Sequence, residues 1–256
     1  MSNLEPGQHY KVEIEQYADA ESPHEMDGTW TLYTFSSKYN SYKNPEDLGI
    51  AGSRRGRPPV ITNPGLRRKM KVGLAFFVSC YSHSGDSWSL AGEGHYCQWD
   101  STQWAGILIW ENKPEDMGAK TYEDRKADAR NDLEQYSAWA NGNTFAYSTS
   151  IVDEDGEEVE HVSSCCGFIV ANGRDEDYLW GEALDCVPLD APVECVSDIL
   201  DDDPDGVVDG GGEYPMRVLR KTEKWGMARK AGFSFEDDTP IGVVEDFLKE
   251  NGLLTM

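Results

Sequence analysis

The sequence lacks the patterns that most often identify an enzyme or a metalloprotein. It contains no G-x-x-x-x-G-K-[ST] loop, no G-x-G-x-x-G after a strand and no G-x-S-x-G. Nucleotide binding and α/β-hydrolase chemistry therefore lose their usual sequence support. None of the six cysteines forms a C-x-x-C pair, which argues against a structural zinc site.

Long hydrophobic stretches are also missing. The first fifteen residues do not show the basic-then-apolar pattern of a secretory signal. The longest apolar runs, near residues 72–78 and 104–110, have the length of strands and are too short to span a bilayer. We therefore expect an intracellular protein with reduced thiols and no membrane association.

Basic residues are scarce: 23 Lys and Arg stand against 47 Asp and Glu, for a formal net charge of −24. The electric field of such a negative charge repels nucleic acid and anionic membranes and attracts basic partners at long range. Solubility in a salty cytoplasm is the alternative explanation. An apolar content of 39%, with 8 Trp, 12 Tyr and 8 Phe, is typical of a folded protein rather than a disordered acidic tail.

One segment, residues 52–73, reverses this charge. It contains no Asp or Glu, so the rest of the chain has 16 basic and 47 acidic residues. Its Pro and Gly content predicts a loop. Three roles are possible for this loop. It would form ion pairs with acidic residues of the same chain, bind an anion or phosphate, or form ion pairs with a second copy in a homo-oligomer. Its basic residues are Arg54, Arg55, Arg57, Arg67, Arg68, Lys69 and Lys71.

Hydrophobic periodicity predicts an α+β fold. Strand patterns occur at residues 9–15, 29–35, 73–79, 105–110, 143–152 and 158–170, and the last two form a hairpin around DEDG at 153–156. A helix is expected from a Thr121 cap to Gly142. We predict an antiparallel sheet with one long helix packed on it, in a core domain at 1–172. A smaller, acidic helical extension would occupy 173–256, packed on or beside the core.

Six potential metal ligands fall within eighteen residues. They are His83, Asp86, Glu93, His95, Cys97 and Asp100. Imidazole, thiolate and carboxylate suit a divalent metal, so a metal-dependent enzyme using His83, His95, Cys97 and Asp100 is one hypothesis. Cys97 with His83 could instead form a nucleophile and base. Because the spacing matches no zinc signature, a structural role is the stronger interpretation, and we favour a binding protein over an enzyme.

The stretch DDDPDGVVDGGGE, residues 201–213, is similar to a calcium-binding loop. Asp201, Asp203, Asp205 and Asp209 occupy ligand positions, but position 12 is a glycine and Glu213 comes one residue late. We interpret the stretch first as a loose acidic loop that would accept calcium when offered. No other cofactor is predicted.

Several short motifs occur in a fixed order within roughly residues 20–170. Their positions are Tyr81, His83, Ser84, Gly85, Cys97, Trp99, Asp100, Ser101, Gln103, Tyr136, Gly142, Cys165, Gly167 and Phe168. Together they resemble a family of uncharacterised phage and mobile-element proteins with a C-P-W-D-S-G-Q-x-G-like segment, although the chain departs from the usual pattern at Gln98, Thr102 and Cys166. The resemblance implies a phage or mobile-element origin and an accessory role in the host cytoplasm, without supplying a catalytic residue.

Charge and resemblance together favour a protein that inhibits a host defence enzyme by imitating nucleic acid. Its partner would be a basic host protein, such as a nuclease, a restriction enzyme or a CRISPR effector. The acidic surface itself would not bind nucleic acid. A structural protein of the virion or of its assembly is the remaining alternative. The acidic residues expected to bind are Asp153, Glu154, Asp155, Glu157, Glu158, Asp201, Asp202, Asp203, Asp205 and Asp209.

Overall fold

The computed structural model describes residues 4–25, 30–52, 58–188 and 191–199, and these divide into two compact units. Unit 1 comprises, among the described residues, 4–17, 145–168, 172–188 and 191–199. Unit 2 comprises 18–25, 30–52, 58–144 and 169–171. Unit 1 combines remote segments of the chain, because the strand at Thr144–Val152 pairs with the first strand, His9–Gln16. The expected division into 1–172 and 173–256 stays a prediction.

Unit 2 is built on a four-stranded antiparallel sheet. In spatial order its strands are β2 (Thr31–Thr34), β7 (Ser101–Ile109), β5 (Ala75–Ser82) and β6 (Asp86–Leu90). Both sides of β5 and β7 are buried, because successive side chains point to opposite faces and both faces are covered. The buried strands predicted at 73–79 and 105–110 are thereby confirmed.

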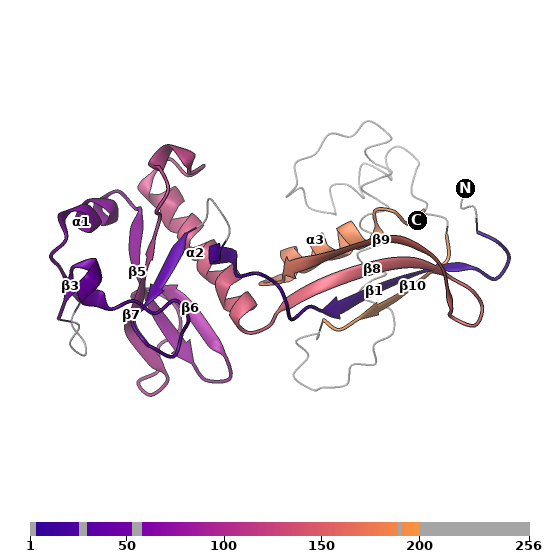
Figure 1. The fold of residues 1–256 in the computed structure, drawn as a ribbon, viewed down its shortest axis with the longest axis horizontal. Helices are drawn as coiled ribbons and strands as arrows, with labels where there is room; N and C mark the ends of the chain where they lie inside the picture. Colours follow the sequence, from indigo (N-terminus) through magenta and orange to yellow (C-terminus); the bar gives the residue numbers. More distant parts are fainter. Residues whose placement is uncertain (1–3, 26–29, 53–57, 189–190, 200–256) are drawn as a thin grey trace, which may run out of the picture. The chain divides into compact units, whose positions relative to one another are not determined.

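Each face of this sheet has its own hydrophobic core. Phe76, Val78 and Leu108 pack with Leu133 and Tyr136 of helix α2 (Tyr122–Ala140). The opposite face is covered by α1 (Pro64–Lys71) and by the ribbon of β3 (Ile50–Ala51) and β4 (Val60–Ile61). Figure 1 shows α1 and β3 on one side of β5 and β7, with α2 on the other. Three short 3₁₀ helices complete the unit: η1 (Pro23–Glu25), η2 (Pro45–Leu48) and η3 (Pro114–Asp116).

Helix α2 begins where the capping pattern predicts. The Thr121 hydroxyl accepts the Asp124 backbone N–H, and the Asp124 carboxylate accepts the Thr121 N–H, each at 3.1 Å. Two otherwise unpaired helical donors are thus satisfied. Among the described helices, none combines the length and the apolar character that a membrane span requires.

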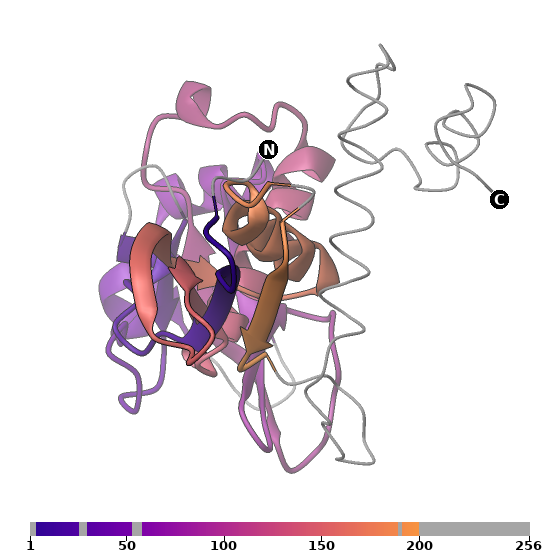
Figure 2. The same ribbon diagram turned by 90° about the vertical axis from the view of Figure 1, so that its right-hand side faces the viewer.

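Unit 1 contains a second four-stranded sheet. Its order is β10 (Val193–Ser197), β1 (His9–Gln16), β8 (Thr144–Val152) and β9 (Glu158–Ile169). Helix α3 (Gly173–Leu184) runs along one face of this sheet (Figure 1 and Figure 2). Val12 and Ile14 of β1 are buried. The Thr149 hydroxyl donates to the Ala183 carbonyl at 2.8 Å and ties the sheet to the helix. The predicted β8–β9 hairpin is confirmed.

The α+β class is confirmed: the described residues form two four-stranded sheets, the two-stranded β3–β4 ribbon and three α-helices. One expectation about the architecture needs correction. The segment around 193–197, expected to be helical, is strand β10, and it pairs in parallel with β1. Its neighbour is remote in sequence, so no local pattern specifies the pairing. The part of the predicted extension from residue 200 onward lies outside the described residues.

The basic segment is also only partly a loop. Residues 64–71 form α1, whose first turn is capped by the Asn63 side chain, with Pro64 at the first helical position. Proline is favoured there because its fixed φ suits the helix and its missing N–H would be unpaired anyway. The Pro and Gly content that indicated a loop therefore marks the start of a helix instead.

Gly106 is required by the close approach of β2 and β7. A Cβ atom on Gly106 would lie 2.4 Å from the Tyr33 carbonyl oxygen. We predict that Gly106→Ala lowers the free energy of unfolding by about 2 kcal/mol, because overpacking displaces a backbone rather than a flexible side chain. Urea unfolding followed by tryptophan fluorescence measures this. Gly118→Ala is the matched control, since a Cβ there meets no atom within 4 Å. Equal stability of the two variants would contradict the close contact.

Candidate functional site

Unit 2 contains an open groove of about 520 Å³ beside the polar ends of β5 and β7. Its walls combine four aromatic side chains with one cation, one carboxylate and several hydroxyl and amide groups. This mixture is typical of a binding site, in which apolar surface supplies contact and a few polar groups fix orientation. The lining residues are Phe35, Ser36, Lys38, Tyr39, Pro45, Cys80, Ser82, Trp99, Asp100, Thr102, Gln103, Trp104 and Ala105.

An interruption in the β5–β7 pairing shapes this groove. Val78 pairs with Gly106 and Cys80 pairs with Thr102, so three residues of β7 lie opposite one residue of β5. Trp104 lies in this bulge with φ of 60°, the one positive value among the described non-glycine residues. Bulges re-aim side chains, and strained backbone of this kind is concentrated at functional sites. The three β7 residues of this bulge direct the Trp104 side chain toward the groove, where it forms part of the wall.

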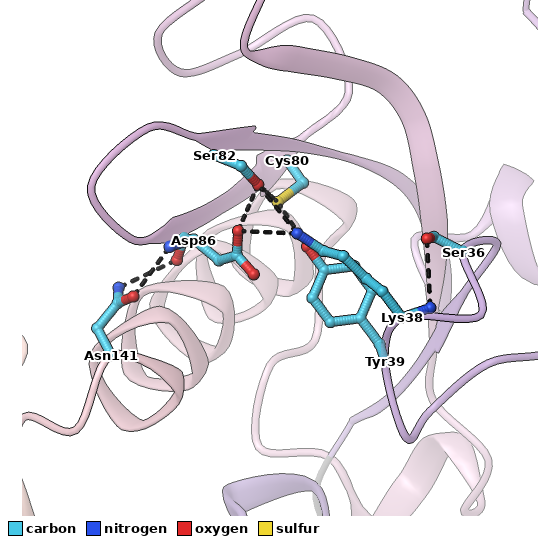
Figure 3. A network of polar contacts seen from close by, with 7 residues as sticks. All are labelled: Ser36, Lys38, Tyr39, Cys80, Ser82, Asp86 and Asn141. Atoms are coloured by element: carbon cyan, nitrogen blue, oxygen red, sulfur yellow. Dashed lines mark hydrogen bonds and ion pairs between the residues drawn. The ribbon is translucent and has the colours of Figure 1, made fainter.

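Figure 3 shows a polar network that includes Lys38, Tyr39, Cys80 and Ser82. These four residues also line the groove. The Ser82 hydroxyl donates to Asp86 Oδ1, and Lys38 Nζ lies 3.4 Å from the same oxygen. Lys38 Nζ is also 4.5 Å from the centre of the Tyr39 ring. Asn141 fixes Asp86 from behind, because its amide accepts the Asp86 N–H at 2.9 Å and donates to the Asp86 carbonyl at 3.1 Å.

Electrostatics hold this network in one protonation state. Burial raises the pKa of Asp86, but hydrogen bonds from Ser82, Tyr39 and Lys38 outweigh burial and leave the pKa below its ordinary value. Burial raises the pKa of the Cys80 thiol and of the Tyr39 phenol. The wall therefore presents a closed carboxylate–ammonium pair and a protonated thiol, so Cys80 is not prepared to act as a nucleophile.

Three of the sequence-predicted candidates come together next to the groove. His83 Nδ1 lies 3.2 Å from Asp100 Oδ2, and Cys97 Sγ lies 3.6 Å from the same oxygen. The carboxylate thus stands between the imidazole and the thiol. A nucleophile and base would need the imidazole to contact the thiol directly, with the carboxylate behind the imidazole. The observed order suits a hydrogen-bonded turn better than an activated cysteine.

Two further members of the predicted cluster, Glu93 and His95, have other partners. His95 packs edge-on against the Tyr81 ring, with centroids 4.9 Å apart. Glu93 accepts two hydrogen bonds from Arg130 and pairs with Lys126 at 2.8 Å. Within the described ranges, no group of three His, Cys, Asp or Glu side chains is arranged to hold a metal ion.

Unit 1 contributes a different surface, the acidic hairpin, defined as residues 153–160 between and along β8 and β9. Asp153 Oδ1 accepts the backbone N–H groups of Asp155 and Glu157, each at 3.0 Å, and so fixes the turn. Glu154, Asp155, Glu157 and Glu158 are exposed. Five of the predicted binding residues thus lie in one hairpin. Asp201, Asp202, Asp203, Asp205, Asp209 and Glu213 lie outside the described residues, as does the predicted calcium loop.

The two units differ strongly in charge. The described part of unit 2 has 16 acidic and 11 basic residues, whereas that of unit 1 has 16 acidic residues against Lys11 and Arg174 alone. This segregation was not anticipated from the sequence, because unit 1 combines segments from both ends of the chain. The acidic residues of unit 1 are Glu5, Glu13, Glu15, Asp153, Glu154, Asp155, Glu157, Glu158, Glu160, Asp175, Glu176, Asp177, Glu182, Asp185, Glu194 and Asp198.

Two of the described basic residues of segment 52–73 form hydrogen bonds or ion pairs within unit 2. Lys69 Nζ donates to the Trp110 carbonyl and pairs with Glu111, both at 2.7 Å. Arg67 donates to the Ile61 carbonyl. Arg68 and Lys71 also lie on α1, while Arg54, Arg55 and Arg57 lie outside the described residues. In this segment Lys69 therefore forms an ion pair with an acidic neighbour, and Arg67 forms a hydrogen bond to the backbone.

Comparison with known proteins gives no assignment. No protein-family model matches the chain, and searches of curated proteins and of solved structures found no match. The resemblance to phage and mobile-element proteins accordingly stays a prediction.

The Glu93–Arg130 pair predicts a specific sensitivity to acid. Hydrogen bonds from Arg130 lower the pKa of Glu93 to about 2. A depressed carboxyl pKa stabilises the fold above the unfolded-state pKa, and this stabilisation is lost as the pH falls from about 5 to 2. We expect Arg130→Gln to lower the stability of the fold modestly at pH 7, because water screens this half-exposed pair. The cost should shrink at pH 3.

Urea unfolding at pH 7 and pH 3 measures this difference for wild type and variant. Arg68→Gln is the matched control, because Arg68 is exposed on α1 and forms no ion pair among the described residues. Its effect should be small at both pH values. A cost of Arg130→Gln that does not change with pH would show that the ion pair is not the cause.

Proposed function

We propose that this protein acts by binding, and that the acidic hairpin contacts a basic, nucleic-acid-binding surface of another protein. The observation that carries the proposal is the hairpin itself. Six carboxylates lie within residues 153–160, with no Lys or Arg among them. Asp153 accepts two hydrogen bonds from the backbone of the turn, and the other five carboxylates of the hairpin are exposed.

The hairpin offers negative charge in a regular arrangement. Alternate residues of a strand lie on the same face, about 7 Å apart, since each residue advances the chain about 3.3 Å. Glu158 and Glu160 on β9 have this relationship. A groove that binds nucleic acid presents Lys and Arg to a regular row of phosphates, so fixed carboxylates compete for the same cations.

The charge of unit 1 supports the same role. A nearly unopposed set of acidic groups accelerates association with a basic partner by long-range attraction and rejects nucleic acid. Combined with the resemblance to phage proteins, this favours a host defence enzyme as the target, such as a nuclease, a restriction enzyme or a CRISPR effector. Inhibition would follow because the protein and the nucleic acid cannot occupy one groove together.

Removing the outward charges should weaken this binding without disturbing the turn. The variant Glu154→Gln/Asp155→Asn/Glu157→Gln/Glu158→Gln keeps Asp153 and every side-chain shape. We expect immobilised wild type to retain from host lysate a DNA-binding protein that duplex DNA displaces. With that protein purified, the variant should associate about tenfold more slowly and show a weaker dependence on salt, because steering is lost.

The matched control removes four exposed carboxylates of unit 2, as Glu46→Gln/Glu115→Gln/Asp116→Asn/Glu134→Gln. Both variants have the same net charge, so a difference between them is due to position. If the hairpin variant and the control variant associate with the partner at equal rates, the effect is due to net charge alone and not to the hairpin. Recovery of no nucleic-acid-binding protein, or capture that ignores salt, would contradict the proposal. Recovery of virion components would favour an assembly protein instead.

A further inference from the structure

The groove of unit 2 has a feature that the acidic hairpin does not explain. Trp99, which lines the groove, is 84% exposed. This is unfavourable, because burying an apolar side chain of this size would stabilise the protein. Phe35, Tyr39 and Trp104 line the same hollow. An exposed tryptophan beside other aromatic rings and a carboxylate is the arrangement that binds a planar cation. We propose that this groove binds an arginine side chain within a basic peptide segment.

Asp100 supplies the complementary charge. Its contacts with His83 and Cys97 both use Oδ2, and within the described part of the chain no group hydrogen-bonds to Oδ1. The side chain is about one-third exposed and lines the groove next to Trp99. A guanidinium stacked on the indole can therefore donate to Oδ1 with a charge-assisted hydrogen bond.

Lys38 does not oppose this cation. Its ammonium group is paired with Asp86, 3.4 Å away, so the two charges cancel locally. Asp100, by contrast, is paired with no Lys or Arg among the described residues. Lys38 also lies over the Tyr39 ring, which shows that the aromatic wall already accepts a cation.

The shape of the groove favours a peptide over a free cation. Its volume of about 520 Å³ exceeds that of one side chain, and Ser36, Thr102 and Gln103 line the remaining space. Hydroxyl and amide groups can pair with the backbone of residues flanking the arginine. Anionic ligands are disfavoured, because they would face Asp100 and a chain of net charge −24.

The proposal is tested with short peptides that carry a single positive charge. Calorimetry on the full chain compares acetyl-Gly-Arg-Gly-amide with the same peptide containing citrulline, which has nearly the shape of arginine but no charge. We expect the arginine peptide to bind at least about tenfold more tightly, since it makes a charged hydrogen bond. One charge is too few to engage the hairpin, so the four-carboxylate hairpin variant should bind the peptide like wild type.

Three substitutions separate the contributions within the groove. Asp100→Asn should weaken arginine binding about tenfold, and Trp99→Phe about threefold, since phenylalanine is the weaker cation–π partner. Lys38→Met should strengthen binding, because Asp86 loses its counter-charge. Asp116→Asn, an exposed carboxylate elsewhere in unit 2, is the control and should have no effect. Far-ultraviolet circular dichroism verifies that each variant is folded, and Trp99→Phe keeps the test valid if Asp100→Asn unfolds.

Several outcomes would overturn the inference. Equal binding of the arginine and citrulline peptides would remove the role of charge. Weaker binding by Lys38→Met would mean that Lys38 contacts the ligand, which points to an anion. Binding of neutral saccharides, sensitive to Trp99→Phe in the absence of arginine binding, would assign the groove to a sugar. Failure here would leave the hairpin proposal intact, because neither its residues nor its partner assay are shared.

Discussion

The antiparallel pairing of β5 with β7 is the constraint on which unit 2 depends. From Ala75 to Val78 the pairing is regular, and side chains of both strands enter two separate cores. Beyond Val78 the register shifts, and the paired residues become polar. One pair of strands thus provides the stable centre of the unit at one end and an irregular, ligand-sized hollow at the other. Strain at Trp104 is tolerated because the regular half of the pairing holds both strands in place.

Unit 1 has a small sheet that carries many negative charges, and these are kept away from its buried side chains. Its buried positions, such as Val12 and Ile14, alternate with Glu13 on the opposite face. The remaining carboxylates are concentrated at the hairpin and on α3, where water screens their repulsion. Only Asp153 has a clear structural use in the hairpin turn. The binding role proposed above uses the other hairpin carboxylates, which are exposed.

Local signals in the sequence predicted local structure well. The Thr121 capping box, the buried runs at 73–79 and 105–110 and the hairpin around DEDG all depend on neighbours within a few residues. The parallel pairing of β1 with β10 joins segments about 180 residues apart, and no periodicity reveals such a partner.

The candidate site was predictable only in part, for the same reason. His83, Cys97 and Asp100 are close in the chain and meet in the structure. By contrast, Lys38 reaches Ser82 and Asp86 from a distant loop, and the bulge at Trp104 depends on the register of two strands. A further local hint was the pair Trp99 and Trp104 in CQWDSTQWAG.

The acidic hairpin and the groove differ in the kind of recognition that they can provide. Charges on an exposed hairpin act over a Debye length, about 8 Å at physiological salt, and mainly change how fast a basic partner arrives. A groove that stacks one side chain on an indole acts only in contact, so it governs how long the partner stays. Neither property substitutes for the other, since steering without contact gives promiscuous, short-lived complexes. A chain that has to select one basic protein among many therefore benefits from having both surfaces.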